Sequence, residues 1–174
     1  MEDKVTVSQI GLKYGIIIGL VFIVYGMILE FMGLELETQQ YFGYLNYVLL
    51  VVVIVLAHKA FKEGGDGYMS IGQGLGIGTL ISLVGGAISG VFSYIYIKFI
   101  DDSMLTKIKD LQIEKMEEQG MDDAQIEQAM EIAGKLMSAE MIPVWAILGM
   151  LFIGFILSLI VSLFTKNANP TLEV

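Results

Sequence analysis

The stretch that decides the fold runs from Ser70 to Ile100 and reads SIGQGLGIGTLISLVGGAISGVFSYIYIKFI. It carries no charged residue before Lys98, and it exceeds the roughly 20 apolar residues that a membrane-spanning helix needs. Ser70 and Gln73 form the S-x-x-Q pattern of a capping box, which predicts that a helix begins here. From Ile71 to Ile100 a helix would measure about 45 Å, against about 30 Å of hydrocarbon core. We therefore expect this helix to tilt, bend or protrude from the bilayer.

Small residues recur every four positions along the same stretch. They form one unbroken row, which is Gly74, Gly78, Ser82, Gly86 and Gly90. Similar rows occur in the first and last apolar segments: Gly11, Gly15 and Gly19, and then Gly154, Ser158 and Ser162. Inside lipid, helices associate through close packing of such small residues. We therefore expect the helix 71–100 at the centre, with the first and last helices in its grooves. In the alternative, one of these faces binds a second copy or a partner subunit.

Three further segments are long and apolar enough to span a membrane, or nearly so: about 14–33, 41–57 and 141–164. The segment 41–57 is the shortest and has no row of small residues, so we expect it at the periphery. Of the 174 residues, 55% are hydrophobic and 17% charged. A soluble domain is about 45–50% apolar and about 25% charged. The sequence predicts an all-α integral membrane bundle of four transmembrane helices, forming a single membrane domain over 1–174.

The composition also excludes several classes of function. The chain has no cysteine and one histidine, which excludes disulfides, thiolate catalysis and Cys- or His-rich metal sites. Its net charge is −9, and a polyanion does not hold nucleic acid by neutralising phosphates. The single histidine, His58, lies at the end of the second segment, whereas the acidic residues lie mostly elsewhere. We see no catalytic constellation, so we expect no enzyme, no cofactor and no resident metal.

The lysines predict an orientation, because cytoplasmic loops carry an excess of positive residues. Five lysines flank the apolar segments on one side of the membrane: Lys4, Lys13, Lys59, Lys62 and Lys166. The short loop between the first two segments has no lysine. We therefore expect both termini and the 58–70 loop in the cytoplasm. The four lysines of the loop 101–140 are opposing evidence, although they stand among eleven acidic residues.

The loop 101–140 is polar and has the pattern of two helices divided by Gly120. Its eleven acids and four lysines give it a net charge of −7, most of the chain's −9. Asp102 or Ser103 can cap the first helix. Asp122 and Gln125 resemble a capping box for the second. That second helix carries one apolar stripe, which is Ile126, Met130, Ala133 and Met137. We expect an acidic helical hairpin outside the cytoplasm, whose acids and stripe form a surface for a protein partner.

Several motifs, taken in order, resemble one known family. They are KYG at 13–15, SIGQGLGIG from Ser70, FSYIYIKFID from Phe92 to Asp101, and GMDDAQIEQAM from Gly120 to Met130. Their order and spacing resemble the Bacteroidota membrane proteins called domain of unknown function 4199, over nearly the whole chain. The resemblance implies a multi-pass protein of the bacterial inner membrane, with four helices and a long loop between the third and the fourth. It implies no activity, substrate or site residue.

Three functions are compatible with these features. The first is an accessory or scaffold protein that binds partners through the acidic hairpin and the glycine-rich helix 71–100. Membrane lipids and either another protein or a second copy would be its partners. The second is a small channel or solute carrier that acts as an oligomer, with the hydroxyls of Ser82, Ser89 and Ser93 along its path. The third is a lipid- or metal-handling membrane protein. The large patterned loop and the lack of charges deep in the membrane favour the first.

Overall fold

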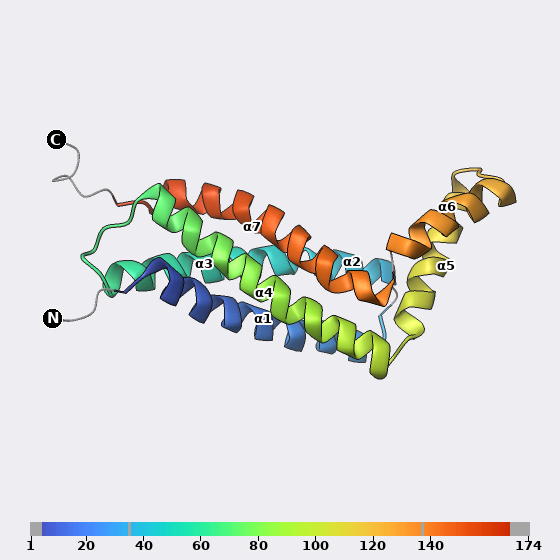
Figure 1. Cartoon of the computed structure of the whole chain (residues 1–174), viewed down its shortest axis with the longest axis horizontal. Coiled ribbons are helices and arrows are strands. Elements are labelled where there is room, and N and C mark those ends of the chain that lie inside the picture. Colours follow the sequence, from blue (N-terminus) through green and yellow to red (C-terminus); the bar gives the residue numbers. More distant parts are fainter. Residues whose placement is uncertain (1–4, 35, 137, 168–174) are drawn as a thin grey trace.

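The computed structural model describes residues 5–34, 36–136 and 138–167, which form an elongated helical bundle (Figure 1). The helices are α1 (Val7–Phe31), α2 (Leu36–Gly43), α3 (Leu45–Glu63), α4 (Ile71–Phe99), α5 (Ser103–Glu118), α6 (Asp123–Leu136), the 3₁₀ turn η1 (Ala139–Met141) and α7 (Ile142–Thr165). Four helical stretches are long and apolar enough to cross a membrane: Val7–Phe31, Tyr41–Glu63, Ile71–Phe99 and Ala139–Thr165. The predicted all-α class, with four helices long and apolar enough to span a membrane, is confirmed for the described residues.

Two of the spanning helices extend beyond the predicted segments. Helix α1 begins at Val7, not near Tyr14, because Thr6 and Gln9 form a capping box at its start. The backbone N–H of Gln9 donates to Thr6 Oγ1 over 3.2 Å, and Thr6 N–H donates to Gln9 Oε1 over 2.9 Å. The second spanning stretch continues past Ala57 as α3, and α2 precedes it. In each case a polar turn extends the helix outside the apolar run.

Helix α4 lies between α1 and α7 and packs along both of them (Figure 1). Its predicted capping box is present, since Gln73 N–H donates to Ser70 Oγ over 3.2 Å and Ser70 N–H donates to Gln73 Oε1 over 2.8 Å. Helix α3 packs against all three with a narrower stripe, in which Leu50 and Ile54 are fully buried. The centre of the bundle is therefore the glycine-rich helix.

The small residues of α1 face α4. They are Gly11, Gly15 and Gly19. A Cβ atom on Gly11 would lie 2.7 Å from Cβ of Leu80, and one on Gly15 would lie 2.7 Å from Cβ of Val84. Both distances are too short for real side chains, so α1 could not approach α4 this closely with any larger residue. The absence of a side chain at these positions sets the spacing of the two helices.

Glycines and serines of α4 and α7 interlock in the same way. A Cβ atom on Gly78 would overlap the side chain of Ser158, and one on Gly154 would overlap that of Ser82. Ser158 Oγ also donates to the carbonyl oxygen of Gly74 over 3.1 Å, which joins the two helices inside the bundle. Further along α4 the row continues against α7, where its members are Gly86 and Gly90. The small-residue rows of α1, α4 and α7 thus meet one another within the chain.

The described ends of the chain lie at the same end of the bundle (Figure 1). Met69 and Asn167 exchange two backbone hydrogen bonds of 2.8 and 3.0 Å, and Val5 N–H donates to the carbonyl oxygen of Gly64 over 3.4 Å. The loop between α3 and α4 therefore lies beside both described ends. This arrangement fits a chain that crosses the membrane an even number of times between its two described ends.

At the opposite end, α5 and α6 extend beyond the bundle (Figure 1). We call these two helices and their connection, residues 103–136, the arm. The chain turns at Gly120, whose φ of 77° favours glycine. Helix α6 begins as predicted, because Asp122 and Gln125 exchange side-chain to backbone hydrogen bonds of 2.9 and 3.0 Å. The predicted cap of α5 was wrong: Asp102 occupies the cap position without a side-chain hydrogen bond.

Candidate functional site

A cavity of about 410 Å³ lies at the arm end of the bundle, between α1, the α2–α3 stretch, α4, α5 and the start of α7. Its walls are largely apolar, and include Phe22, Met27, Phe92, Ile97, Met104 and Ile108. Ligand sites in proteins are concave, mostly apolar and about 300–1,000 Å³ in volume, with a few polar groups that fix orientation. This central cavity therefore has the size and lining of a binding site.

One polar atom in the wall of the central cavity lacks a partner. The side-chain oxygen Oδ1 of Asn46 is buried and accepts no hydrogen bond from the part of the chain that the structure describes. Nearby, Ser89 Oγ donates to the carbonyl oxygen of Gly85 over 2.9 Å, so the hydroxyl hydrogen of Ser89 is already used. A buried amide oxygen without a donor costs about 1–3 kcal/mol. Asn46 can therefore accept a hydrogen bond from a bound molecule.

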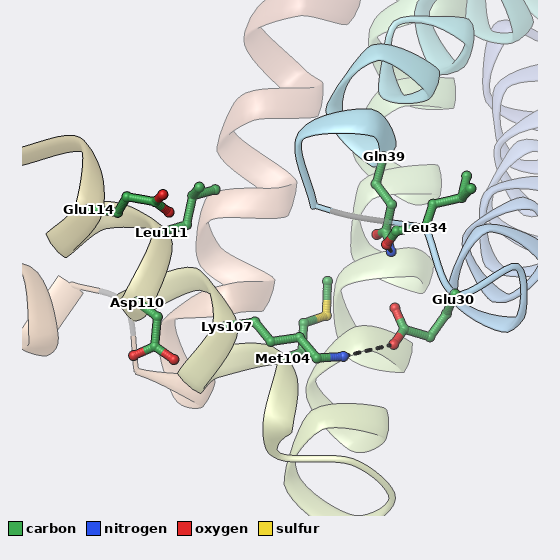
Figure 2. Close-up of a pocket in the computed structure, with 9 residues that line it drawn as sticks. Glu30, Leu34, Gln39, Met104, Lys107, Asp110, Leu111 and Glu114 are labelled. Atoms are coloured by element: carbon green, nitrogen blue, oxygen red, sulfur yellow. Dashed lines mark hydrogen bonds and ion pairs between the residues drawn. The ribbon is translucent and has the colours of Figure 1, made fainter. Parts of the chain in front are cut away.

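A second, charged cavity of about 450 Å³ adjoins the central one where α5 meets the end of α1 (Figure 2). The two share Glu30, Gln39 and Met104 in their walls. Lys107 extends from α5 toward Glu30 of α1, with Nζ 3.8 Å from Oε1 (Figure 2). The Glu30 side chain is only 23% exposed, whereas that of Lys107 is 53% exposed. An ion pair between two helices thus stands beside the apolar cavity.

A third cavity of about 630 Å³ lies between α3 and α7 and shares Phe22, Gly43, Asn46 and Ser89 with the central one. Its rim carries three exposed aromatic residues, Tyr44, Tyr47 and Trp145. Trp145 Nε1 donates to the carbonyl oxygen of Leu136 over 2.8 Å. Tyrosine and tryptophan gather at membrane–water interfaces. The three cavities therefore run from a charged pocket, through an apolar interior, to a side opening at interface depth.

The predicted partner surface on α6 is partly used inside the chain. Ile126 is 8% exposed, and Met130 and Ala133 are half-buried. Met137 lies outside the described residues. This burial arises because α5 and α6 are joined by a short turn and pack against each other. The exposed large apolar residues of α6, within its described side chains, are instead Ile132 and Leu136.

His58, the single histidine, lies at the other end of the bundle and is fully buried. Its Nε2 lies 3.0 Å from the carbonyl oxygen of Gly74, and its Nδ1 lies 2.7 Å from Thr165 Oγ1. Lys62 Nζ donates to the carbonyl oxygen of Thr165 over 3.0 Å. These bonds join α3 to α4 and α7. Within the described ranges, no group of three or more His, Cys, Asp or Glu side chains is placed to hold a metal ion.

The sequence contained two signals for the cavities, although it did not bring them together. Asn46 is the only amide in an otherwise apolar segment, and Glu30 is an acid near the end of another. A polar residue within a membrane span is expensive and so indicates a function. Their common cavity depends on how the α2–α3 stretch and α5 lie against α1 and α4. No spacing along the chain predicts that arrangement.

The four long apolar helices are those of a multi-pass membrane protein, and the bundle encloses cavities with apolar and charged walls. A scan of protein families matches residues 13–167 to the family described as Protein of unknown function (DUF4199). The match covers most of the chain, which therefore belongs to this family, as the order of its motifs predicted. No curated protein and no solved structure shows significant similarity to the chain.

Proposed function

We propose that this protein binds one amphiphilic lipid molecule, with apolar chains in the central cavity and a polar head beside Glu30 and Lys107. The observation that carries the proposal is the buried, unpartnered Oδ1 of Asn46 in the wall of a largely apolar cavity. Water alone would satisfy the amide but would leave the apolar walls wet. An amphiphile with a hydrogen-bond donor near the base of its head satisfies the amide and the walls together.

The filled half of the bundle favours lipid binding over a channel within one chain. Between the cavities and the described ends of the chain, four side chains of α3 and α4 fill the interior of the bundle and are fully buried. They are Leu50, Ile54, Ile77 and Ile81. Two of the hydroxyls that a path would use are hydrogen-bonded within the helix: Ser82 Oγ donates to the carbonyl oxygen of Gly78 and Ser89 Oγ to that of Gly85, each over 2.9 Å. The cavities are therefore closed towards that end, as suits a binding site.

The test is lipid retention by the purified full-length chain, measured by native mass spectrometry after detergent extraction. Asn46→Leu keeps a side chain of similar size and removes the polar atom, so we expect retained lipid to fall about fivefold or more. The variant should still fold, because replacing an unpaired buried amide with an apolar group does not destabilise the bundle. Val52→Leu, on the exposed side of the same helix, is the matched control. Equal lipid retention by both variants and the parent would refute the site.

A second candidate function is that of an accessory or scaffold protein that binds a partner through the arm. The arm extends beyond the bundle, and its exposed residues include acids and the apolar Ile132 and Leu136. Crosslinking in native membranes should recover one stoichiometric partner, and Ile132→Ser with Leu136→Ser should abolish it. Lys109→Gln, an exposed change on the other helix of the arm, should leave the complex intact. A monomer in every case would exclude this role.

We place the protein in the inner membrane of a bacterium, as a non-catalytic component with both termini and the α3–α4 loop in the cytoplasm. The lysine distribution supports this orientation, and the gathering of the two described ends at one end of the bundle supports a common side for both. The arm and the charged cavity then lie on the outer side, where the arm contacts the outer leaflet or its surroundings.

A further inference from the structure

The ion pair between Glu30 and Lys107 connects the arm to α1, and it can be separated easily. Glu30 belongs to the last turn of α1, and Lys107 to the second turn of α5. Their N–O distance of 3.8 Å is beyond hydrogen-bond length, and the lysine side chain is half exposed. At this separation, and with its lysine half exposed, the pair holds α5 to α1 only weakly. A ligand with one positive and one negative group can therefore pair with Glu30 and Lys107 separately, and little stability is lost when their direct contact is broken.

The walls of the charged cavity select which head group fits there. They carry three carboxylates, on Glu30, Asp110 and Glu114, and one ammonium, on Lys107. Asp110 and Glu114 lie on α5, on the far side of the pocket from Glu30 (Figure 2). A purely anionic head would face an excess of carboxylates, and like charges brought together are unfavourable. A purely cationic head would leave Lys107 without a counter-charge. A head with both charges meets both requirements.

The charged cavity continues directly into the central one. Glu30, Gln39 and Met104 belong to the walls of both. Gln39 is held in place, because its Nε2 donates to the carbonyl oxygen of Leu34 over 3.0 Å. A head group between Glu30 and Lys107 therefore has its acyl chains at the entrance of the apolar cavity, with Asn46 further inside.

On the basis of the proposed lipid site, we infer that the ligand is a zwitterionic aminophospholipid whose ammonium pairs with Glu30 and whose phosphate pairs with Lys107. Its head then stands between α1 and α5 and replaces the direct ion pair. Met104 and Ile108 of α5 also line the central cavity, so the same lipid contacts the arm as well as the bundle. Occupancy of the cavity therefore changes the position of the arm.

Lipid preference tests the head group. The delipidated full-length chain is mixed in detergent with phosphatidylethanolamine or phosphatidylglycerol of identical acyl chains, and bound lipid is counted by native mass spectrometry. We expect about fivefold more phosphatidylethanolamine than phosphatidylglycerol. Glu30→Gln and Lys107→Gln should each remove the preference. Lys109→Gln, an exposed lysine on the same helix that does not line the pocket, should keep it.

Arm position tests the coupling. The natural chain has no cysteine, so a chain that carries both Gln128→Cys on α6 and Val24→Cys on the exposed face of α1 takes spin labels at these two positions only. Phosphatidylethanolamine should shift the distance between the labels, and phosphatidylglycerol should not.

Equal retention of both lipids would overturn the inferred head group but leave the proposed lipid site standing. Absence of any bound lipid would overturn both. Selective binding of phosphatidylethanolamine with an unchanged distance would overturn the coupling to the arm.

Discussion

At the scale of single residues, Gly78 and Gly149 show two different uses of glycine in the same pair of helices. A Cβ atom on Gly78 would overlap the side chain of Ser158 on α7. A Cβ atom on Gly149, which belongs to α7 itself, would meet nothing within 4 Å. The first glycine sets the distance between α4 and α7, whereas the second leaves open space beside its helix.

This difference predicts opposite outcomes for the same substitution. Gly78→Ala should lower the free energy of unfolding by about 1–3 kcal/mol, because the added methyl group overpacks a filled interface. Gly149→Ala should leave stability unchanged or raise it by up to about 1 kcal/mol, since alanine is the better helix former. Thermal unfolding of both variants in one detergent, followed by circular dichroism at the helix band, measures this. Equal losses for the two variants would contradict the packing described here.

The sequence shows a regular spacing of the packing residues but no comparable pattern among the residues of the proposed site. The spacing of Gly74, Gly78 and Gly86 is regular, and helix geometry places such residues on one face whatever surrounds them. Asn46, Glu30 and Lys107 have no such regularity, because their proximity arises from three separate elements. A polar residue in an apolar segment can be recognised from the sequence, but its cavity depends on tertiary structure.

At the scale of elements, the start of α5 differs from the predicted cap. Asp102 has φ of −85° and ψ of −9°, which is helical backbone, whereas a capping residue is usually extended. Its side chain consequently caps nothing. The preceding residue takes this part: the Asp101 carboxylate accepts a hydrogen bond of 2.9 Å from Ser103 N–H. Sequence alone cannot separate neighbouring aspartates, because the backbone angles decide which of them reaches the helix.

These bonds predict how the start of α5 responds to pH. The Ser103 hydroxyl and the Ser103 backbone N–H both donate to the Asp101 carboxylate. Together they lower the pKa of that carboxyl below its ordinary value, and the hydroxyl has the larger effect. A lowered pKa means that the stabilisation is complete above the ordinary pKa of aspartate and is lost as pH falls through the lowered one. Ser103→Ala should move the pKa of Asp101 back up. Thr106→Ala, which removes a hydroxyl one turn further on, should not.

The measurement is an NMR titration of the ¹³C-labelled Asp101 carboxyl in the parent and in both variants, in the same detergent. Because burial raises the pKa of a carboxyl, the lowered pKa of Asp101 belongs to its local hydrogen bonds and not to burial. If Ser103→Ala leaves the titration unchanged, the hydroxyl is not a donor to this carboxylate.

Helix bounds illustrate a second limit on prediction from sequence. The apolar runs correctly indicated four helices long and apolar enough to span a membrane, since hydropathy reports which residues suit a lipid environment. The ends were less accurate: α3 continues to Glu63, beyond the predicted Ala57, through polar residues that lipid does not require. A turn at Tyr44 separates α2 from α3, where no proline marks a break. Apolar runs therefore predict where a helix crosses the membrane and not where it ends.

At the scale of the whole molecule, the loop between α3 and α4 and the arm lie at opposite ends of the bundle (Figure 1). Glu63 is exposed at the first end, and Gln128 is exposed on the arm. The two positions must therefore differ in accessibility if the four long helices cross the membrane. The lysines predict that the Glu63 end faces the cytoplasm, because Lys59 and Lys62 lie there.

Cysteine labelling tests this orientation in spheroplasts, which have lost the outer membrane but keep the inner membrane intact. Since the natural chain has no cysteine, Gln128→Cys and Glu63→Cys each introduce one reactive thiol. A membrane-impermeant maleimide should label Gln128→Cys before permeabilisation and Glu63→Cys only after it. The reverse pattern would place the arm in the cytoplasm, so the charged cavity would then face the inner leaflet. Labelling of both residues from outside would contradict a bundle that crosses the membrane between them.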